Sequence, residues 1–283
     1  MRLLNRLDLP LVAGSELAGV VEAAGPGVTR FAAGDRVFAR VDKSKLGAFA
    51  DYAAVNQGLV AKMPAGLDFV QAAGLPLTGL TALQALRDEL GVARGDRLYI
   101  SGGAGGVGTM AIPIAKRMGA EVATTASGSG EALVSRLGAD RVIDYTREKV
   151  QDVLHDYDAA FDLIGDDLAG TFAILKPGGK VVSIAGVPEP DTARQDLDAG
   201  PMVTALFWLA STKLRRQARQ HHVSYRYMFM HPSGDDLAFL AQLADERALE
   251  VITDRIFPFD RIADAFAYLE QGRAHGKVIV QMV

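Results

Sequence analysis

The sequence predicts an α/β protein with a doubly wound parallel sheet and a second, β-rich part. Two observations predict this fold. From residue 97 to residue 184, short apolar runs of strand type alternate with segments of helical periodicity. Such alternation indicates parallel βαβ units with right-handed crossovers. Residues 11–60 instead show short apolar pairs separated by glycine-rich turns, which is typical of short strands joined by turns.

The composition fits a folded protein with one large domain or two ordinary ones. The chain has 283 residues, of which 49% are hydrophobic and 23% charged, so it can bury a substantial core. Its net charge of −4 excludes a global basic field that would hold nucleic acid or an anionic membrane. The absence of cysteine excludes disulfides, thiol nucleophiles and cysteine-ligated zinc. No apolar run approaches the roughly 18 residues of a membrane span and no signal-peptide pattern is present, so we expect a cytoplasmic protein.

The first predicted elements are short strands followed by a helical segment. Val20-Val21 and Val37-Phe38 are apolar strand formers bounded by turn sequences. Between Phe69 and Leu90, leucines recur near helical spacing, which predicts a helix there.

The alternating series follows after residue 96. The predicted strands span 97–101, 121–125, 141–144, 159–163 and 180–184, and the predicted helices span 107–118, 131–137 and 168–175. Pro113 lies inside the first of these helices, where it should kink the helix or remove a hydrogen bond.

After residue 184 the pattern becomes less regular. Residues 187–200 are acidic and rich in turn formers, so we expect a surface loop. Residues 213–222 are basic, and we expect the solvated face of a helix, with an anionic partner as the alternative. The apolar side of that helix would include Leu206, Leu209 and Leu214. The last predicted elements are strands at 225–230, near Arg255 and at 277–282, and helices at 235–243 and 262–269.

The most informative segment is the glycine-rich turn at 102–108, between a predicted strand and a predicted helix. Gly103, Gly105 and Gly108 have the GxGxxG spacing of a Rossmann dinucleotide-binding turn. The glycines let backbone N–H groups approach a pyrophosphate, and the helix N-terminus adds a positive potential. A packing turn without a ligand is the alternative. A P-loop is excluded because the Gly-Lys pair before the last strand of the series is followed by Val181 and not by a hydroxyl residue.

The end of the second strand in the series indicates the type of dinucleotide. NAD enzymes usually place an acidic residue there, about 20 residues after the turn, to bind the ribose hydroxyls. Residues 124–129 read Thr-Thr-Ala-Ser-Gly-Ser and contain no carboxylate that would repel a 2′-phosphate. This favours NADP(H) over NAD(H), although no Arg or Lys lies in the same segment.

Several segments spread over nearly the whole chain together resemble one family. They are Gly14–Val21, Gly34–Val37, Gly47–Tyr52, Leu77–Ala82, the turn at 102–108, Leu137–Asp140 with Val142–Tyr145, Leu175–Gly179 and Gly276–Val278. The chain is similar to the zinc-free medium-chain dehydrogenases/reductases, in the branch of the quinone oxidoreductases and alkenal (enone) reductases. The resemblance implies a Rossmann NADP-binding domain at 79–230. It also implies a GroES-like substrate domain formed by residues 1–78, shortened at the N-terminus, and residues 231–283.

The resemblance further implies where the phosphates of a bound NADP(H) would lie. Ser127 and Tyr145 would flank the 2′-phosphate. For Tyr145, aromatic packing on the sheet at a strand end is the alternative. The pyrophosphate would lie on the turn, with Gly106 and Val107 in contact, and the cofactor-binding residues of the turn are Gly103, Ala104, Gly105, Gly106, Val107 and Gly108.

Other residues are implied near the nicotinamide end of the cofactor. The backbone of Ala185 and Gly186, together with Phe229, would border the nicotinamide. Thr81 and Lys277 would lie close to the cofactor. The alternatives are a helix hydroxyl that bonds nearby backbone for Thr81 and a solvated strand-end lysine for Lys277.

Three departures from the family pattern affect these expectations. Ser15 occupies the position of a histidine in zinc-dependent relatives, and cysteine is absent, so we expect no metal. Ser129 replaces a basic residue of the family. Met1 lies just upstream of the segment that begins at Gly14, whereas in the family several strands precede it. We therefore expect either a misplaced start codon or a naturally shortened substrate domain.

The resemblance implies an NADPH-dependent oxidoreductase that transfers hydride to a small molecule, either a quinone or an α,β-unsaturated carbonyl. It also implies a homodimer. Hydrogen-bond donors would stabilise the charge that develops on the substrate oxygen, and the candidates are Tyr52, Thr78 and Thr81, with solvent as the proton source. Burial of Tyr52 in the core or between domains is the alternative for that residue. No catalytic residue is assigned. The alternative function is a dinucleotide-binding protein with little turnover, because the substrate domain is incomplete.

Overall fold

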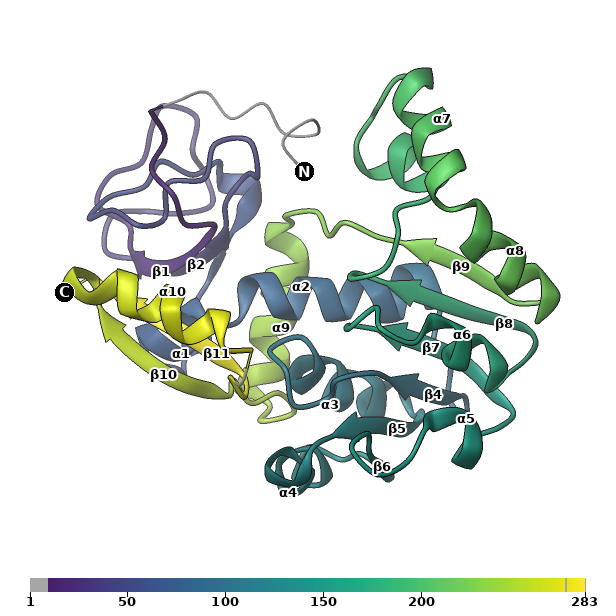
Figure 1. Cartoon of the computed structure of the whole chain (residues 1–283). Coiled ribbons are helices and arrows are strands. Elements are labelled where there is room, and N and C mark those ends of the chain that lie inside the picture. Colours follow the sequence, from purple (N-terminus) through teal and green to yellow (C-terminus); the bar gives the residue numbers. More distant parts are fainter. Residues whose placement is uncertain (1–9, 273, 283) are drawn as a thin grey trace. The chain divides into compact units, whose positions relative to one another are not determined.

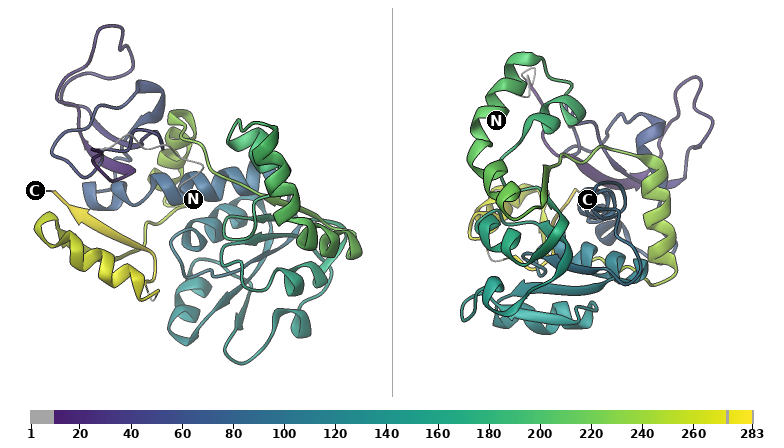
Figure 2. Two further views of the ribbon diagram at one scale, coloured as in Figure 1. Left: turned by 45° about the horizontal axis from the view of Figure 1, so that its top comes forward. Right: turned by 90° about the vertical axis from the view of Figure 1, so that its right-hand side faces the viewer.

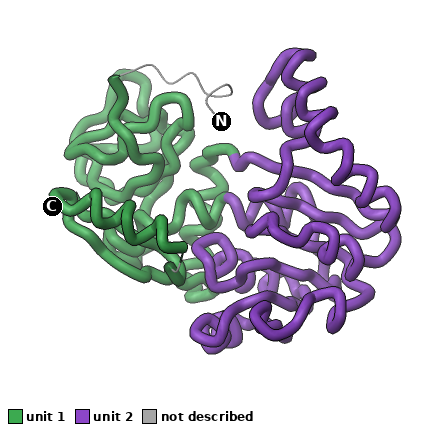
Figure 3. The backbone as a smooth tube through the Cα atoms, viewed as in Figure 1, with its two compact units in different colours: residues 1–80, 231–283 green, residues 81–230 purple. Residues whose placement is uncertain are grey.

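A computed structural model describes residues 10–272 and 274–282 of the chain. Its backbone contacts separate two compact units (Figure 3). Unit 1 consists of Met1–Leu80 together with His231–Val283, and unit 2 consists of Thr81–Met230. Each unit contains its own β-structure.

A six-stranded parallel sheet forms the centre of unit 2 (Figure 1). Its strands are β4 (Arg97–Ile100), β5 (Glu121–Ala126), β6 (Arg141–Asp144), β7 (Tyr157–Asp162), β8 (Leu175–Ser183) and β9 (Ser224–Tyr227). They lie in the order β6-β5-β4-β7-β8-β9, and every neighbouring pair is parallel. The chain thus runs from β4 in the middle to one edge and then from β7 to the other edge, which confirms the predicted doubly wound sheet.

Helices connect the strands of unit 2. They are α3 (Gly108–Met118), α4 (Gly128–Arg136), α5 (Val150–Val153), α6 (Leu168–Ala173), α7 (Pro201–Ala210) and α8 (Thr212–Gln220), with the short π-helices η2 (Ala85–Leu90) and η3 (Thr192–Asp196). Leu98, Ile100 and Phe161 of the sheet are fully buried, as expected for a parallel sheet covered on both faces. α3 continues through Pro113 to Met118, so the proline does not end this helix.

Two strand boundaries differ from the expectation. β8 begins at Leu175, five residues before the predicted start at 180, because α6 already ends at Ala173. The strand predicted at 225–230 ends at Tyr227. The last residue of β8, Ser183, pairs with Tyr227, so the sheet offers no partner strand beyond this point.

The expectation of a surface loop at 187–200 is wrong. This segment contains η3, and Glu189 and Thr192 are buried. Their polar groups satisfy each other, since the backbone N–H of Thr192 donates to Glu189 Oε1 at 3.2 Å and the Thr192 hydroxyl donates to the carbonyl oxygen of Tyr227 at 2.7 Å. Acidic composition therefore did not indicate exposure here, because the acidic groups have partners inside the unit.

The segment 201–220 forms two helices in series, α7 and α8, at one end of unit 2 (Figure 2). Leu214 of α8 packs against the core, as predicted. The expected apolar side is not covered at Leu206 and Leu209, which are 59% and 68% exposed. Phe207 is the buried residue of α7. Helical periodicity identifies an apolar face but not what covers it.

Unit 1 contains two small sheets. The antiparallel sheet has the order β1-β2-β3, with β1 (Glu16–Val20), β2 (Arg36–Arg40) and β3 (Val60–Lys62), and the parallel pair is β10 (Thr253–Pro258) with β11 (Lys277–Gln281). The helices are α1 (Phe69–Ala73), α9 (Gly234–Asp245), α10 (Ile262–Glu270), the 3₁₀-helices η1 (Gln57–Leu59) and η4 (Phe259–Arg261), and α2 (Pro76–Gln84), which contains the boundary between the units.

An apolar cavity of about 1300 Å³ lies within unit 1, lined mainly by residues of β1, the loops on either side of β2, α10 and β11. α9 packs against β3 on the antiparallel sheet. Over the part of the chain that the structure describes, no helix has the length and hydropathy needed to cross a bilayer.

Candidate functional site

The candidate site is the carboxyl edge of the parallel sheet, where the strand order reverses. β4 and β7 are neighbours at this point, and the chain continues from them toward opposite edges of the sheet. In doubly wound sheets, ligands bind outside the strand ends at such a reversal. The glycine-rich turn at 102–108 leaves β4 here, and Asp162 is the last residue of β7.

The three glycines of the GxGxxG pattern have different structural roles. A Cβ atom on Gly103 would lie 2.2 Å from Thr124 Oγ1, and one on Gly108 would lie 2.6 Å from the carbonyl oxygen of Gly102. Neither position has space for a side chain. A Cβ atom on Gly105 would meet only that same carbonyl oxygen, at 3.4 Å, which is an ordinary contact. Packing within the protein therefore explains Gly103 and Gly108, whereas Gly105 leaves open space beside the backbone.

The amino end of α3 follows this open space. Its N-cap residue, Val107, is apolar and makes no side-chain capping bond to the first turn. The backbone N–H groups of Thr109 and Met110 already donate to the carbonyl oxygens of Gly105 and Val107, and the dipole of this helix of 11 residues adds a positive potential at this end. The open space at Gly105 and the uncapped helix end together fit the pyrophosphate of a dinucleotide.

A buried carboxylate, Asp162, joins the ends of three strands. Its Oδ1 accepts a hydrogen bond from the hydroxyl of Ser101, directly after β4, at 3.0 Å, and one from the backbone N–H of Gly165 at 3.0 Å. Its Oδ2 accepts from the hydroxyl of Ser183, at the end of β8, at 2.6 Å. The Ser101 hydroxyl in turn accepts from the backbone N–H of Leu163 at 2.8 Å. Asp162 therefore fixes the segments that follow β4, β7 and β8 relative to one another.

Ser183 extends this cluster to the segment after β8. Its hydroxyl oxygen accepts from the backbone N–H groups of Ala185 at 3.2 Å and Gly186 at 2.8 Å. A Cβ atom on Gly186 would lie 2.5 Å from the hydroxyl of Tyr225, so this position requires glycine. The structure thus places Ala185 and Gly186, which were predicted from the family resemblance, on the same sheet edge as the glycine-rich turn.

The structure brings Ser127 and Tyr145 to neighbouring strand ends. Ala126 of β5 pairs with Asp144 of β6, and Ser127 and Tyr145 are the residues that follow. Ser127 is the N-cap of α4, but its side chain makes no capping bond. Tyr145 is 61% exposed, so the alternative that it packs on the sheet is wrong; the edge strand β6 has already ended at Asp144. The largely exposed Arg147 lies two residues further and pairs with Asp144 at 3.3 Å.

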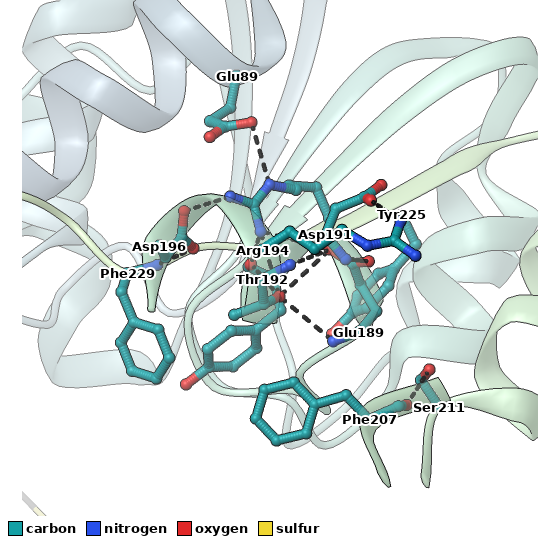
Figure 4. A network of polar contacts seen from close by, with 12 residues as sticks. Glu89, Glu189, Asp191, Thr192, Arg194, Asp196, Phe207, Ser211, Tyr225 and Phe229 are labelled. Atoms are coloured by element: carbon teal, nitrogen blue, oxygen red, sulfur yellow. Dashed lines mark hydrogen bonds and ion pairs between the residues drawn. The ribbon is translucent and has the colours of Figure 1, made fainter. Parts of the chain in front are cut away.

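A second buried polar cluster surrounds Arg226 on β9 (Figure 4). The guanidinium lies 2.5 Å from Asp196 Oδ1, 3.3 Å from Glu189 Oε1 and 3.5 Å from Glu89 Oε2. It also donates a hydrogen bond to the hydroxyl of Thr192 at 3.1 Å. Burial acts to lower the pKa of Arg226, but Asp196, Glu89 and Glu189 raise it by more, so the guanidinium stays protonated.

The same cluster holds Phe229, which was predicted to border the nicotinamide. The second carboxylate oxygen of Asp196 accepts from the backbone N–H of Phe229 at 2.9 Å. The ring of Phe229 packs edge-on against Tyr227, with 5.2 Å between ring centroids. Asp196 belongs to η3 and Phe229 follows β9, so the cluster connects the two ends of the segment between β8 and β9.

The predicted hydroxyl donors differ in their availability. The hydroxyl of Thr78 donates to the carbonyl oxygen of Gly74 at 3.0 Å, so it is already used within the helix. Thr81 is buried in α2. Tyr52 is 75% exposed and lies in an irregular segment, so its expected burial in the core is wrong, while burial between domains stays a prediction.

Lys277 lies at the start of β11 in unit 1. Its Nζ is 2.5 Å from Glu16 Oε1, and the other oxygen of Glu16 accepts from the backbone N–H of Leu77 at 2.8 Å. The side chain of Lys277 is mostly buried. The alternative of a solvated strand-end lysine is therefore wrong, because this lysine has a carboxylate partner in the interior of unit 1.

Sequence reasoning missed the residues that hold the loops. Ser101, Asp162 and Ser183 each end or directly follow an apolar strand at the edge where the strand order reverses, and this position is the signal that could have identified them. Arg226 was included in a predicted strand without a role. Its partners could not be identified from the sequence, because Glu89 and Asp196 come from other segments.

Ser15, which occupies the position of a histidine in zinc-dependent relatives, lies in unit 1. Ser15 directly precedes β1, and its carbonyl oxygen accepts from a guanidinium N–H of Arg40 at 2.6 Å. Within residues 10–272 and 274–282, no group of three or more His, Cys, Asp or Glu side chains is arranged to hold a metal ion.

Comparisons with known proteins match both units. The zinc-binding dehydrogenase family matches residues 137–280, and the alcohol dehydrogenase GroES-like domain matches residues 2–65. The mitochondrial NAD(P)H oxidoreductase RTN4IP1 of Danio rerio is 33% identical over 287 residues, which cover 98% of this chain and 73% of that protein. The chloroplastic NADPH-dependent alkenal/one oxidoreductase of Arabidopsis thaliana is 36% identical over 284 residues, which cover 96% of this chain and 64% of that protein.

Solved structures of oxidoreductases are also similar to this chain over nearly its whole length. The quinone oxidoreductase from Coxiella burnetii matches with a TM-score of 0.83 and 29% sequence identity, over 98% of this chain and 81% of that chain. The CurK enoyl reductase matches with a TM-score of 0.79 and 26% identity, over 96% of this chain and 80% of that chain.

Proposed function

We propose a specific reaction for this chain, which belongs to the medium-chain dehydrogenase/reductase superfamily, in its quinone oxidoreductase and alkenal reductase branch, and is an NAD(P)H-dependent oxidoreductase. The reaction is hydride transfer from NADPH to a quinone or to the β-carbon of an α,β-unsaturated carbonyl, without zinc. Relatives named as an alkenal/one oxidoreductase and a quinone oxidoreductase support this substrate class. A homodimer and a cytoplasmic location stay predictions, since some relatives are named as mitochondrial or chloroplastic.

The observation that carries the proposal is the open space at Gly105. The protein has no packing reason for glycine at this position, and a pyrophosphate that approaches the backbone supplies one. The backbone of Ala104–Val107 and the amino end of α3 would hold the phosphates, while Gly103 and Gly108 allow the turn to pack. NADPH supplies the hydride when bound.

The chain's own residues would orient the nicotinamide and exclude water from it. The backbone of Ala185 and Gly186, fixed by the Ser183 hydroxyl, and the backbone of Phe229, fixed by Asp196, would border the ring. The hydroxyl of Thr78 is used within its helix, and Thr81 is buried with a partner of its own, so the exposed Tyr52 is the candidate donor to the substrate oxygen. Solvent would supply the final proton.

Selectivity for NADPH over NADH is proposed to come from the ends of β5 and β6. Ser127 is uncharged and its side chain caps no helix, Tyr145 is exposed beside it, and the exposed Arg147, which pairs with Asp144, would turn its guanidinium to the predicted 2′-phosphate. The Ser127→Asp variant should weaken NADPH binding by at least about tenfold through like-charge repulsion and leave NADH binding nearly unchanged. Fluorescence titration with both cofactors measures this. Equal changes for both cofactors would contradict the assignment.

The function is tested by following NADPH oxidation with an ortho-quinone and with a 2-alkenal as acceptors. The Gly105→Ala variant should keep its thermal stability but lose NADPH affinity and turnover, because the new methyl group fills the space for the pyrophosphate. Gly66→Ala is the matched control, since a Cβ atom there also meets no clash and the residue lies outside the site. Wild-type activity in Gly105→Ala would show that the dinucleotide does not bind at this turn.

A dinucleotide-binding protein with little turnover is the second candidate. The observation that favours it is the apolar cavity in unit 1, where β1 is the edge of a three-stranded sheet and β11 belongs to a separate strand pair. NADPH binding that Gly105→Ala abolishes, combined with no reduction of either acceptor, would establish this candidate. Turnover with either acceptor would exclude it.

A further inference from the structure

The helix α7 exposes large apolar side chains on one face. Met202 is 84% exposed, Leu206 59% and Leu209 68%, and Trp208 beside them is 54% exposed. The helix contains no charged residue. Positions 202, 206 and 209 follow each other at intervals of four and three, so these three side chains form one stripe along the helix.

The stripe continues into α8 with a change from apolar to basic residues. Helical hydrogen bonds cross the junction, from the N–H of Ser211 to the carbonyl oxygen of Phe207 and from the N–H of Arg215 to that of Ser211, both at 2.9 Å. Ser211 itself has φ −88° and ψ 1° and belongs to neither helix, but these bonds keep α8 close to the continuation of α7. At the next intervals of four and three lie the exposed Lys213 and Arg216. The α7–α8 stripe denotes Met202, Leu206, Leu209, Lys213 and Arg216.

The charge on this stripe is local. The whole chain has a net charge of −4, but residues 201–222 contain four Lys and Arg residues and no Asp or Glu. Within the described part of the chain, neither Lys213 nor Arg216 forms an ion pair. Two exposed, unpaired cations thus adjoin three exposed apolar side chains, an arrangement that suits a partner with both apolar and anionic parts.

Trp208 connects the apolar and the basic parts. The guanidinium of Arg215 lies over its ring, 5.3 Å from the centroid, and donates to the carbonyl oxygen of Trp208 at 2.9 Å. An indole ring beside cations is suited to the boundary between headgroups and acyl chains, where an amphipathic side chain contacts both.

We propose that the α7–α8 stripe docks on the surface of a lipid bilayer that carries anionic headgroups. Met202, Leu206 and Leu209 would enter the boundary of the acyl chains, while Lys213 and Arg216 contact the headgroups. A second copy of the chain is a poorer occupant. A pairing of the whole stripe with itself sets cations against cations or against leucines, whereas a bilayer surface offers apolar and anionic groups together. The proposal does not depend on the proposed function, since it involves neither cofactor nor substrate.

The chain carries its own reporter for this surface, because Trp208 is its single tryptophan. Intrinsic fluorescence is recorded with vesicles of phosphatidylcholine alone and with vesicles of phosphatidylcholine and phosphatidylglycerol in equal amounts. We expect a blue shift and quenching by brominated acyl chains with the anionic vesicles only, together with co-sedimentation that added salt weakens. An unchanged emission without co-sedimentation would overturn the proposal, and so would equal binding to both vesicle types.

Variants separate the two parts of the stripe. Leu206→Glu with Leu209→Glu, and separately Lys213→Glu with Arg216→Glu, should each weaken binding to anionic vesicles by at least about tenfold. Arg117→Glu with Arg141→Glu, at exposed positions elsewhere in unit 2, is the matched charge control and should bind nearly as the wild type. All the substituted side chains are exposed, so the variants should fold, and circular dichroism checks this.

A second copy of the chain, the competing occupant of the stripe, is detected with the protein alone. Light scattering without vesicles gives the mass of the protein in solution. A blue shift that grows with protein concentration, together with a dimer that Leu206→Glu with Leu209→Glu dissociates, would show that a second copy covers the stripe and would overturn the proposal.

Discussion

The clusters around Asp162 and Arg226 both hold loops at the carboxyl edge of the sheet, but they do so with opposite chemistry. Asp162 is one carboxylate that accepts hydrogen bonds from neutral hydroxyl and backbone N–H groups. Arg226 is one cation that contacts three carboxylates. The partners of Asp162 come from strand ends next to β7, whereas those of Arg226 come from η2 and from the segment around η3.

This difference determines how much stability the protein loses when one residue of each cluster is substituted. Neutral donors around a carboxylate can be removed one at a time, and each removal costs about one hydrogen bond. The carboxylates around Arg226 repel each other and depend on the same cation. Glu189 and Asp196 are also largely buried, so they cannot turn to water when that cation is absent. The Arg226 cluster should therefore respond to a single substitution more strongly than the Asp162 cluster.

The largest effect is expected for Arg226→Met. The variant keeps much of the side-chain volume but removes the Arg226 cation from the buried Glu189 and Asp196, and we expect a loss of about 3–5 kcal/mol in the free energy of unfolding. Urea unfolding measures this. The matched control is Arg194→Met, since Arg194 pairs with Asp191 at 3.3 Å on the surface of the same segment. We expect the control to lose at most about 1 kcal/mol. Similar losses in both variants would show that burial of the carboxylates does not matter.

A smaller loss is expected for Asp162→Asn. The amide group replaces one acceptor with a donor, so the hydroxyl of Ser101 or Ser183 loses its acceptor, and stability should fall by about 2–3 kcal/mol. Asp158→Asn, in the same strand, is the control. Asp158 accepts from Lys176 at 2.8 Å and is partly exposed, so its substitution should cost less, about 1 kcal/mol. A larger loss of stability in Asp162→Asn than in Arg226→Met would contradict the expectation that the Arg226 cluster is the more sensitive of the two.

The two clusters also differ in how far the sequence could predict them. The glycine-rich turn and the alternating strands were predicted because their signals are local, within one βαβ unit. Asp162 bonds to Ser101 and Ser183, which are 61 and 21 residues away, so its role depends on the strand order and not on nearby residues. The acidic segment with Glu189 was assigned to the surface because composition does not reveal a distant cation such as Arg226.

The exposed side of α7 was missed for a related reason. Apolar spacing placed Leu206 and Leu209 on the apolar side of a helix, and the structure shows both at the surface. A helical pattern establishes which side chains share a face, but tertiary packing decides whether that face is covered. The same applies to Tyr52, whose predicted burial assumed a strand that does not form.

The smallest effect separates two hydroxyls of the Asp162 cluster. Ser101→Ala and Ser183→Ala each remove a hydrogen bond to Asp162 together with the N–H bonds that the hydroxyl accepts, and each should cost about 1–2 kcal/mol in stability. Only Ser183 also accepts from the backbone of Ala185 and Gly186, which border the nicotinamide in the proposed function. Ser183→Ala should therefore lower kcat several-fold with little change in the Kd of NADPH, while Ser101→Ala keeps kcat. Steady-state kinetics and cofactor titration on both variants measure this. An equal fall in kcat would mean that Asp162 acts through the stability of the whole edge and not through the segment after β8.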